Sequence, residues 1–364
     1  LDYNRTFNEK HNVNAIYLVS GFTQTKSGNY HKVANANMAL DVTYNFAHKY
    51  YAEAALSLIH SSRLPENGRK GLSQAYTLGW NIANEWDLEN VDYLKLSASY
   101  SDLKTDIGID YYEYLGYYSS GGWWDWGGSG VTGTQSKKGA NSSLTFINRK
   151  EISATLQGSF FNKQVWFDAS FFTNTIEGQL IDGTSTVPSY FMSYYPESSF
   201  ISRVNFNNDR RTGFDLSVNG KKKFGDWELQ AGINMTYYTT KATKRDDTTV
   251  TDEYQKRTGR YVDGIWGYEC LGFFQNQADL DNSPSQAALG TTHVGDLKYK
   301  DQNGDGIIDF HDQVELAKGG WYGAPFTLGV NLTAKYKGFT LFVLGTGGFG
   351  GTGVKNNSYW WCGA

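Results

Sequence analysis

Long stretches of this chain alternate strictly between apolar and polar residues. The clearest are 226–238 ("DWELQAGINMTYY"), 92–102 ("DYLKLSASYSD") and 326–336 ("FTLGVNLTAKY"). A period of two residues places the two sets of side chains on opposite faces of a β-strand. These runs are longer than the usual strand of about 5–6 residues, and they match the about 9–11 residues that a tilted strand needs to cross a bilayer. The pattern therefore predicts an all-β protein whose strands have one lipid-facing and one polar face.

Short and long connections alternate along the chain. Short polar turns are expected at 6–12, 45–50, 84–90, 160–165, 222–227 and 335–339, and longer connections at about 21–31, 61–72, 103–140, 177–208 and 239–325. Bacterial outer-membrane barrels have short periplasmic turns and long extracellular loops. We therefore expect a transmembrane antiparallel β-barrel with about a dozen strands in this chain. A large soluble β-sandwich is the alternative, because its strands also alternate.

The composition fits strands that cross a membrane. Tyrosine, phenylalanine and tryptophan make up 16% of the residues, and several lie at strand ends, where an interfacial girdle would place them. These are Tyr50, Tyr51, Tyr237, Tyr238, Tyr336 and Phe339. The mean hydropathy of −0.51 does not exclude a barrel, because lipid-facing and lumen-facing residues alternate.

Charge and cysteine content exclude other classes. The net charge of −4 and the lack of a basic stripe give no reason to expect a nucleic-acid partner. No Ser-His-Asp or Cys-His set can be assembled, so we expect no enzyme. Two cysteines, Cys270 and Cys362, are too few for a disulfide framework, and whether they pair stays open.

The stretch "DQNGDGIIDFHD" (301–312) has the ligand spacing of a calcium-binding loop. Oxygen ligands are expected from Asp301, Asn303, Asp305, the Ile307 carbonyl, Asp309 and Asp312, and Gly306 supplies the sharp turn. Position 12 is Asp rather than the usual Glu, which makes bidentate coordination less assured. A solvated acidic turn is the alternative. If calcium binds, we expect it to clamp a long extracellular loop.

A second candidate is the aromatic stretch "DYYEYLGYYSSGGWWDWGGSG" (110–130). Its candidate binding residues are Tyr111, Tyr112, Tyr114, Trp123, Trp124 and Trp126. Aromatic rings stack on sugars and form hot spots in protein interfaces. Ligand contact, docking to a partner protein and packing of the loop on itself all remain open.

Several motifs in this order resemble the SusC-like (SusC/RagA-type) TonB-dependent transporters of the Gram-negative outer membrane. The matching stretches are "YNRTFNEKHNVNAIYL" (3–18), "YNFAHKYYAEAALSLIHSSRL" (44–64), "LGWNIANEWDLENVDYLKLSASYS" (78–101), "GYECLGFFQNQADLDNSP" (267–284) and "GDLKYKDQNGDGIID" (295–309), the last leading into "YKGFTLFVLGTGGFG" (336–350). Two features depart from the family: "LSQAYTLGW" (72–80) replaces its usual Phe-Pro-Ser ahead of the Gly-Trp strand, and Cys270 occupies a position that is more often polar.

The resemblance implies a plugged barrel of about 22 strands. It further implies energy from TonB through a missing N-terminal region, a SusD-like surface lipoprotein as lid, and oligosaccharide or peptide substrates. We find no plug domain, TonB box or final strands in the sequence. Residues 1–364 are therefore expected to be a partial barrel domain, an internal piece with long extracellular loops at about 103–140, 177–208 and 239–325.

We therefore expect part of an outer-membrane nutrient importer in contact with outer-membrane lipid. A SusC-like barrel that serves as a scaffold subunit of a larger envelope complex is the alternative. A passive porin or adhesin barrel would be favoured if the complete chain had no plug.

Overall fold

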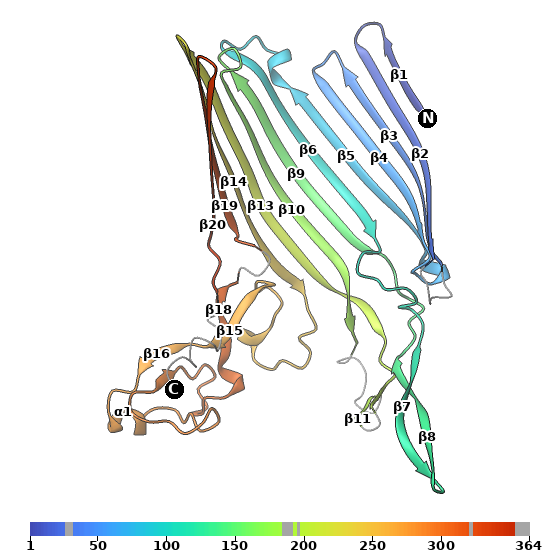
Figure 1. The fold of residues 1–364 in the computed structure, drawn as a ribbon, viewed down its shortest axis with the longest axis vertical. Helices are drawn as coiled ribbons and strands as arrows, with labels where there is room; N and C mark the ends of the chain where they lie inside the picture. The colour runs from blue at the N-terminus through green and yellow to red at the C-terminus, as the bar shows by residue number, and fades with distance from the viewer. Residues whose placement is uncertain (26–31, 184–191, 195–196, 320–322, 354–364) are drawn as a thin grey trace.

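A computed structural model describes residues 1–25, 32–183, 192–194, 197–319 and 323–353 of this chain (Figure 1). Twelve strands form one antiparallel sheet, in the order β1-β2-β3-β4-β5-β6-β9-β10-β13-β14-β19-β20. They are β1 (Asp2–Phe7), β2 (His11–Thr25), β3 (Lys32–Phe46), β4 (Tyr50–Ser61), β5 (Lys70–Asn81), β6 (Val91–Thr105), β9 (Ile147–Phe160), β10 (Val165–Asp182), β13 (Arg203–Phe224), β14 (Trp227–Lys244), β19 (Phe326–Tyr336) and β20 (Phe339–Phe349). A single sheet excludes the soluble sandwich, and the expected dozen strands are confirmed.

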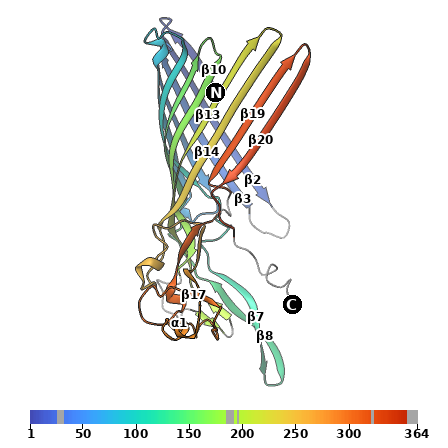
Figure 2. The same ribbon diagram turned by 90° about the vertical axis from the view of Figure 1, so that its left-hand side faces the viewer.

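Most turns at one end of the sheet are tight, and the longest connections lie at the other end (Figure 1). The connection between β5 and β6 (82–90) departs from this pattern, because it is longer than the one between β4 and β5 (62–69) at the loop end. The β13–β14 turn consists only of residues 225–226, and the β19–β20 turn of residues 337–338. The sheet is curved rather than flat (Figure 2). Within the described residues β1 and β20 form its two edges, so the strands describe an arc and not a closed ring.

The register of the strands separates an apolar face from a polar face. On the apolar face, one row across six strands consists of Leu96, Leu156, Ala169, Leu216, Met235 and Leu328. One residue along each strand, the polar-face row consists of Ser97, Thr155, Ser170, Asp215, Thr236 and Thr327. Large apolar side chains stay exposed along most of the sheet. So wide an apolar surface is typical of membrane contact, as the alternation predicts.

Small elements fill the long connections. They are β7 (Tyr117–Trp126), β8 (Ser129–Lys138), β11 (Met192–Tyr194), β12 (Glu197–Ser199), β15 (Gly264–Tyr268), β16 (Cys270–Phe273), β17 (Leu297–Tyr299), β18 (Gln313–Lys318), the helix α1 (Gln277–Asp281) and the 3₁₀ turns η1 (Glu66–Gly68), η2 (Ile82–Asn84), η4 (Glu253–Gln255) and η5 (Phe310–Asp312). The hairpin β7–β8 extends beyond the sheet (Figure 1). No helix among the described residues is long and apolar enough to cross a membrane.

The buried core lies where the loops fold over the polar face. It contains Leu64, Ile109, Leu144, Phe146 and Ile147, with Ile59, Tyr114, Ile176 and Leu180 packed against it. Ile147 pairs with Thr105 and Ile176 with Arg149, which are polar-face positions of β6 and β9. Burial of this cluster therefore fixes the loops above the polar side of the sheet.

A buried carboxylate ties the base of the β7–β8 hairpin to the sheet. Glu113, 5% exposed, precedes β7. Its Oε1 lies 3.1 Å from Lys138 Nζ at the end of β8 and 3.8 Å from Arg203 Nη1 at the start of β13. A buried charge needs such partners, so these three residues fix the position of the hairpin.

Candidate functional site

A cavity of about 730 Å³ opens on the polar face at the loop end of the sheet. Its walls come from β9, β10, β13 and β14 and from the loop between β14 and β19. The lining includes both signs of charge: Arg149, Glu151, Asp209, Arg211, Asp215, Asp263 and Lys318. Tyr238 and Phe172 supply its aromatic surface.

Hydrogen bonds across the strands position the side chains of the cavity. Glu151 Oε2 accepts from Asn174 Nδ2 at 2.7 Å, and Asp215 Oδ1 accepts from the Thr236 hydroxyl at 2.6 Å. The guanidinium carbon of Arg211 lies 4.6 Å from the ring centroid of Tyr238. The wall is thus polar and preorganised, and it offers charged groups of both signs to a solute.

The long loop contributes Lys318 to the cavity. Its Nζ donates to the Tyr238 carbonyl at 3.0 Å and lies 5.2 Å from the ring centroid of Tyr237. Burial lowers the pKa of Lys318, and the negative charge of Asp263 partly offsets this decrease. Sequence reasoning missed these cavity residues. The signal that could have found them is the position of charged residues on the polar face near strand ends.

The acidic loop at 301–312 folds as a tight turn around its own carboxylates. Asp301 accepts backbone N–H groups from Gly304 at 2.6 Å and from Gly306 at 2.8 Å. Gly306 has φ +83°, a conformation that favours glycine. Asp305 Oδ1 accepts from the Ile307 N–H at 2.8 Å. The carboxylates of Asp301 and Asp305 thus hold the backbone of the turn.

The last two acidic positions close the loop. Asp309 caps η5, and Asp312 is fully buried. The two oxygens of Asp312 accept N–H groups from Gln302 at 2.7 Å and from Asp309 at 2.8 Å. Asn303 Oδ1 accepts from the Asp305 N–H at 3.0 Å. All six predicted ligand residues thus lie in one compact turn.

The donor set consists only of oxygens, which suits calcium. In the described part of the chain the four loop carboxylates, Asp301, Asp305, Asp309 and Asp312, have no ion-pair partner from Lys or Arg. Within the same residues, no three His, Cys, Asp or Glu side chains converge in the geometry of a metal site. The residues fit calcium by their oxygen donors and by their spacing in the sequence. Calcium binding stays a proposal.

Neighbouring segments rest on the acidic loop. The Tyr254 hydroxyl donates to the His311 carbonyl at 2.7 Å, and His311 Nδ1 lies 2.8 Å from Asp252 Oδ2. Ser285 donates its N–H to the Gly306 carbonyl at 2.9 Å. The acidic turn thus connects η4 with the segment around Ser285.

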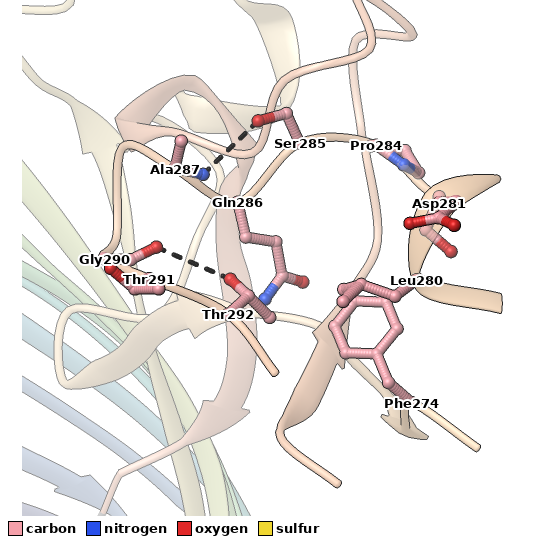
Figure 3. A pocket seen from close by; sticks show the side chains of 11 residues that line it. Phe274, Leu280, Asp281, Pro284, Ser285, Gln286, Ala287, Gly290, Thr291 and Thr292 are labelled. Carbon is pink, nitrogen blue, oxygen red and sulfur yellow. Dashed lines mark hydrogen bonds between the residues drawn. The ribbon is translucent and has the colours of Figure 1, made fainter. Parts of the chain in front are cut away.

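A shallower pocket of about 630 Å³ adjoins this turn (Figure 3). Phe274, 2% exposed, forms its base, and Ser285, Gln286 and Thr292 supply polar groups. The Gln286 side chain is already committed, because its Nε2 donates to the Leu297 carbonyl at 2.9 Å and its Oε1 accepts from the Tyr299 N–H at 2.8 Å. The pocket therefore offers mainly hydroxyls at its rim.

The aromatic candidates divide into two groups. Tyr111, Tyr112 and Tyr114 lie in the loop before β7, with ring centroids 4.3 Å apart for the first pair and 6.1 Å for the second. The Tyr111 hydroxyl donates to the Lys32 carbonyl at 2.9 Å, so these tyrosines pack among the loops.

The tryptophans lie on the β7–β8 hairpin instead. The ring of Trp123 covers Gly130 on the opposite strand so closely that a Cβ there would come within 2.2 Å of its Nε1. Trp126 remains 82% exposed near the tip. Trp123 stays 67% exposed despite this contact and Trp124 is 45% exposed, so all three tryptophans keep surface for a ligand or partner.

Two curated relatives match most of the chain in sequence. TonB-dependent receptor P39 of Formosa agariphila is 22% identical over 416 aligned residues, which cover 96% of this chain and 38% of that protein. TonB-dependent receptor P26 of the same bacterium is 24% identical over 327 residues, 84% of this chain and 31% of that protein. The chain thus spans less than two fifths of the length of either relative. No family model matches it.

Solved structures agree in fold. The RagAB peptide transporter superposes with a TM-score of 0.70 at 18% identity, over 94% of this chain and 39% of that one. The RagAB peptide importer in its open-open state gives 0.73 at 18% identity, over 96% and 40%. These relatives are named as receptors and transporters, not as enzymes. The chain is therefore similar to SusC-like, TonB-dependent transporters along most of its length, which confirms the resemblance seen in the sequence and the Gram-negative outer membrane as its location.

Proposed function

We propose that this chain forms part of a TonB-dependent outer-membrane importer for a nutrient of the oligosaccharide or peptide class. The observation that carries the proposal is the polar-face cavity, which lies beneath the loops at the end of the sheet where long connections gather. A solute that enters between the loops would meet this charged wall before it passes along the polar face.

Both signs of charge in the cavity favour a zwitterionic solute over a neutral one. Arg211 and Lys318 can bind carboxylates, while Asp215 and Asp263 can bind amines. A peptide carries both groups. The similarity to a protein named as a peptide importer supports the same choice.

In the complete protein, TonB would supply the energy and a SusD-like surface lipoprotein would cover the loops. The hairpin with Trp126 is a candidate contact for that lipoprotein. We further propose that calcium occupies the 301–312 loop, where it would neutralise the carboxylates and clamp the connection between β14 and β19.

Disruption of the gene in its own bacterium tests the importer proposal. We expect lost uptake of mixed labelled peptides, and the same loss in the wild type when a protonophore removes the energy for TonB. Unchanged peptide uptake together with lost uptake of labelled oligosaccharides would replace the peptide substrate with a sugar. Unchanged uptake of both, with a disturbed envelope, would favour the scaffold function.

A further inference from the structure

We propose that the loop end of the apolar face binds the phosphate of a lipid headgroup in the outer leaflet, through Arg210, Lys241 and Lys244. This inference goes beyond the proposed import function and depends only on the membrane location. Arg210 and Lys241 are direct partners in the β13–β14 register. Lys244 pairs with Asn208 at the next position of the same face toward the loops, because the strand pair has a bulge between Asn208 and Asp209.

The register places these cations on the lipid-facing side. On β13, Arg210 is an even number of residues away from Phe214 and Leu216. On β14, Lys241 is an even number of residues away from Tyr237 and Met235. Side chains two residues apart share a face of a strand. One row of the same face separates Arg210 and Lys241 from the aromatic pair Phe214–Tyr237, which suits the interface between lipid tails and headgroups.

Two other lysines toward the loop end of this face form ion pairs. Lys150 Nζ lies 2.7 Å from Glu177 Oε2, and Lys104 Nζ lies 3.1 Å from Asp102 Oδ1. Among the residues that the structure describes, none of the three proposed cations has an acidic partner within ion-pair distance. The nearby Arg245 is different, since it pairs with Asp209.

Arg210 and Lys241 also face one another directly, and like charges at paired positions repel. An anion between them would remove this repulsion. The ammonium of Lys244 lies 4.0 Å from the ring centroid of Phe206, and that of Lys241 lies 5.2 Å from the ring centroid of Tyr261. These rings hold two of the cations in place without neutralising them.

Hydroxyl groups lie between the cations and the aromatic row. Thr212 pairs with Thr239 on the same face, and Thr173 Oγ1 lies 3.2 Å from Thr212 Oγ1. Cations beside hydroxyls offer both ion pairs and hydrogen bonds to phosphate oxygens. Because the patch continues into an apolar surface, an anion that carries acyl chains fits it better than a free anion does.

Binding of diphosphorylated lipid A to the purified full-length protein tests the proposal, with native mass spectrometry as the readout. The variant R210Q/K241Q/K244Q should bind about a hundredfold more weakly, because each cation near an anionic lipid surface contributes about fivefold. The matched control K221Q/K222Q/K223Q removes the same charge at the opposite end of β13 and should bind like the wild type.

Three further outcomes decide the assignment. Fully dephosphorylated lipid A should bind the wild type as weakly as the triple variant binds the phosphorylated lipid. Equal loss in the triple variant and its control, or displacement of the lipid by millimolar inorganic phosphate, would overturn the proposal. If the triple variant does not fold, as judged by heat-modifiable gel mobility, the single variants should each lose about fivefold, and no loss in any of them would refute it.

Discussion

Substitution of Asp301 by Asn should remove the response of the longest loop to calcium. Asp301 accepts the N–H groups of Gly304 and Gly306 with its two oxygens. Asparagine has only one side-chain oxygen, so its NH₂ group would face one of these donors. A lost hydrogen bond to a charged group costs about 1.5–3 kcal/mol.

Calcium should add a comparable stabilisation to the wild type. An extracellular loop of this kind has a Kd on the order of 10⁻⁴–10⁻³ M. At a calcium concentration of about 5 mM, binding to the folded loop then stabilises it by roughly 1–2 kcal/mol. Where cleavage requires local opening, this corresponds to about 5–30-fold slower proteolysis in calcium than in chelator.

Limited proteolysis of the full-length protein, with calcium or with EGTA, measures this difference through cuts between Lys244 and Pro325. The variant Asp301→Asn should be cut quickly under both conditions. The control Asp281→Asn lies in the same loop, where Oδ1 of Asp281 accepts from the Gln277 side chain, and it should keep the calcium response. A wild type that is cut equally fast with and without calcium would refute the calcium reasoning.

Three other experiments test the fold and its electrostatics. Leu216→Arg, on the lipid face, should lower the free energy of unfolding by about 2–4 kcal/mol, whereas the neighbouring Ser217→Arg should be tolerated. Urea unfolding in vesicles measures both values. Similar losses of stability in the two variants would contradict the assigned faces. Glu113→Gln should loosen the β7–β8 hairpin by about 3 kcal/mol, seen as faster cleavage there, and unchanged cleavage would argue against the ion-pair anchor. The hydrogen bond from Lys298 lowers the pKa of Asp279 in the folded loop. This bond should therefore stabilise the loop above the unfolded pKa of about 3.9, and the stabilisation should be lost as the pH falls below that value through the lowered pKa of the folded loop. Proteolysis of the loop against pH should show this loss in the wild type and not in Asp279→Asn.

The sequence was sufficient to predict the strands, because along most of the sheet one face is apolar and the other polar. In β14, the apolar residues from Trp227 to Tyr237 alternate with polar ones, and the structure keeps that alternation through the pairing with β13 and β19. The turn lengths also predicted the topology, because two strands joined by a tight turn are neighbours both in the chain and in the sheet.

The loops were harder to predict, because their contacts join distant segments without a periodic pattern. Glu113 and Lys138 lie in the connection between β6 and β9, and Glu113 also contacts Arg203 at the start of β13, which is far away in the sequence. The cavity residues behave in the same way, since Lys318 contacts β14 from the end of β18, far along the connection between β14 and β19. The acidic turn at 301–312 is the exception, because the carboxylates of Asp301, Asp305 and Asp312 accept hydrogen bonds from within the turn itself.

A bulky group attached within the cavity tests the transport claim most directly. Thr236 lines the cavity, and Met235, the next residue of β14, lies on the lipid-facing side. In cells that carry Thr236→Cys or Met235→Cys, labelled-peptide uptake is measured before and after treatment with a large maleimide. Modification at position 236 should block uptake, whereas modification at position 235 should have no effect. Equal uptake after modification at both positions, with labelling at 236 confirmed by mass spectrometry, would contradict it.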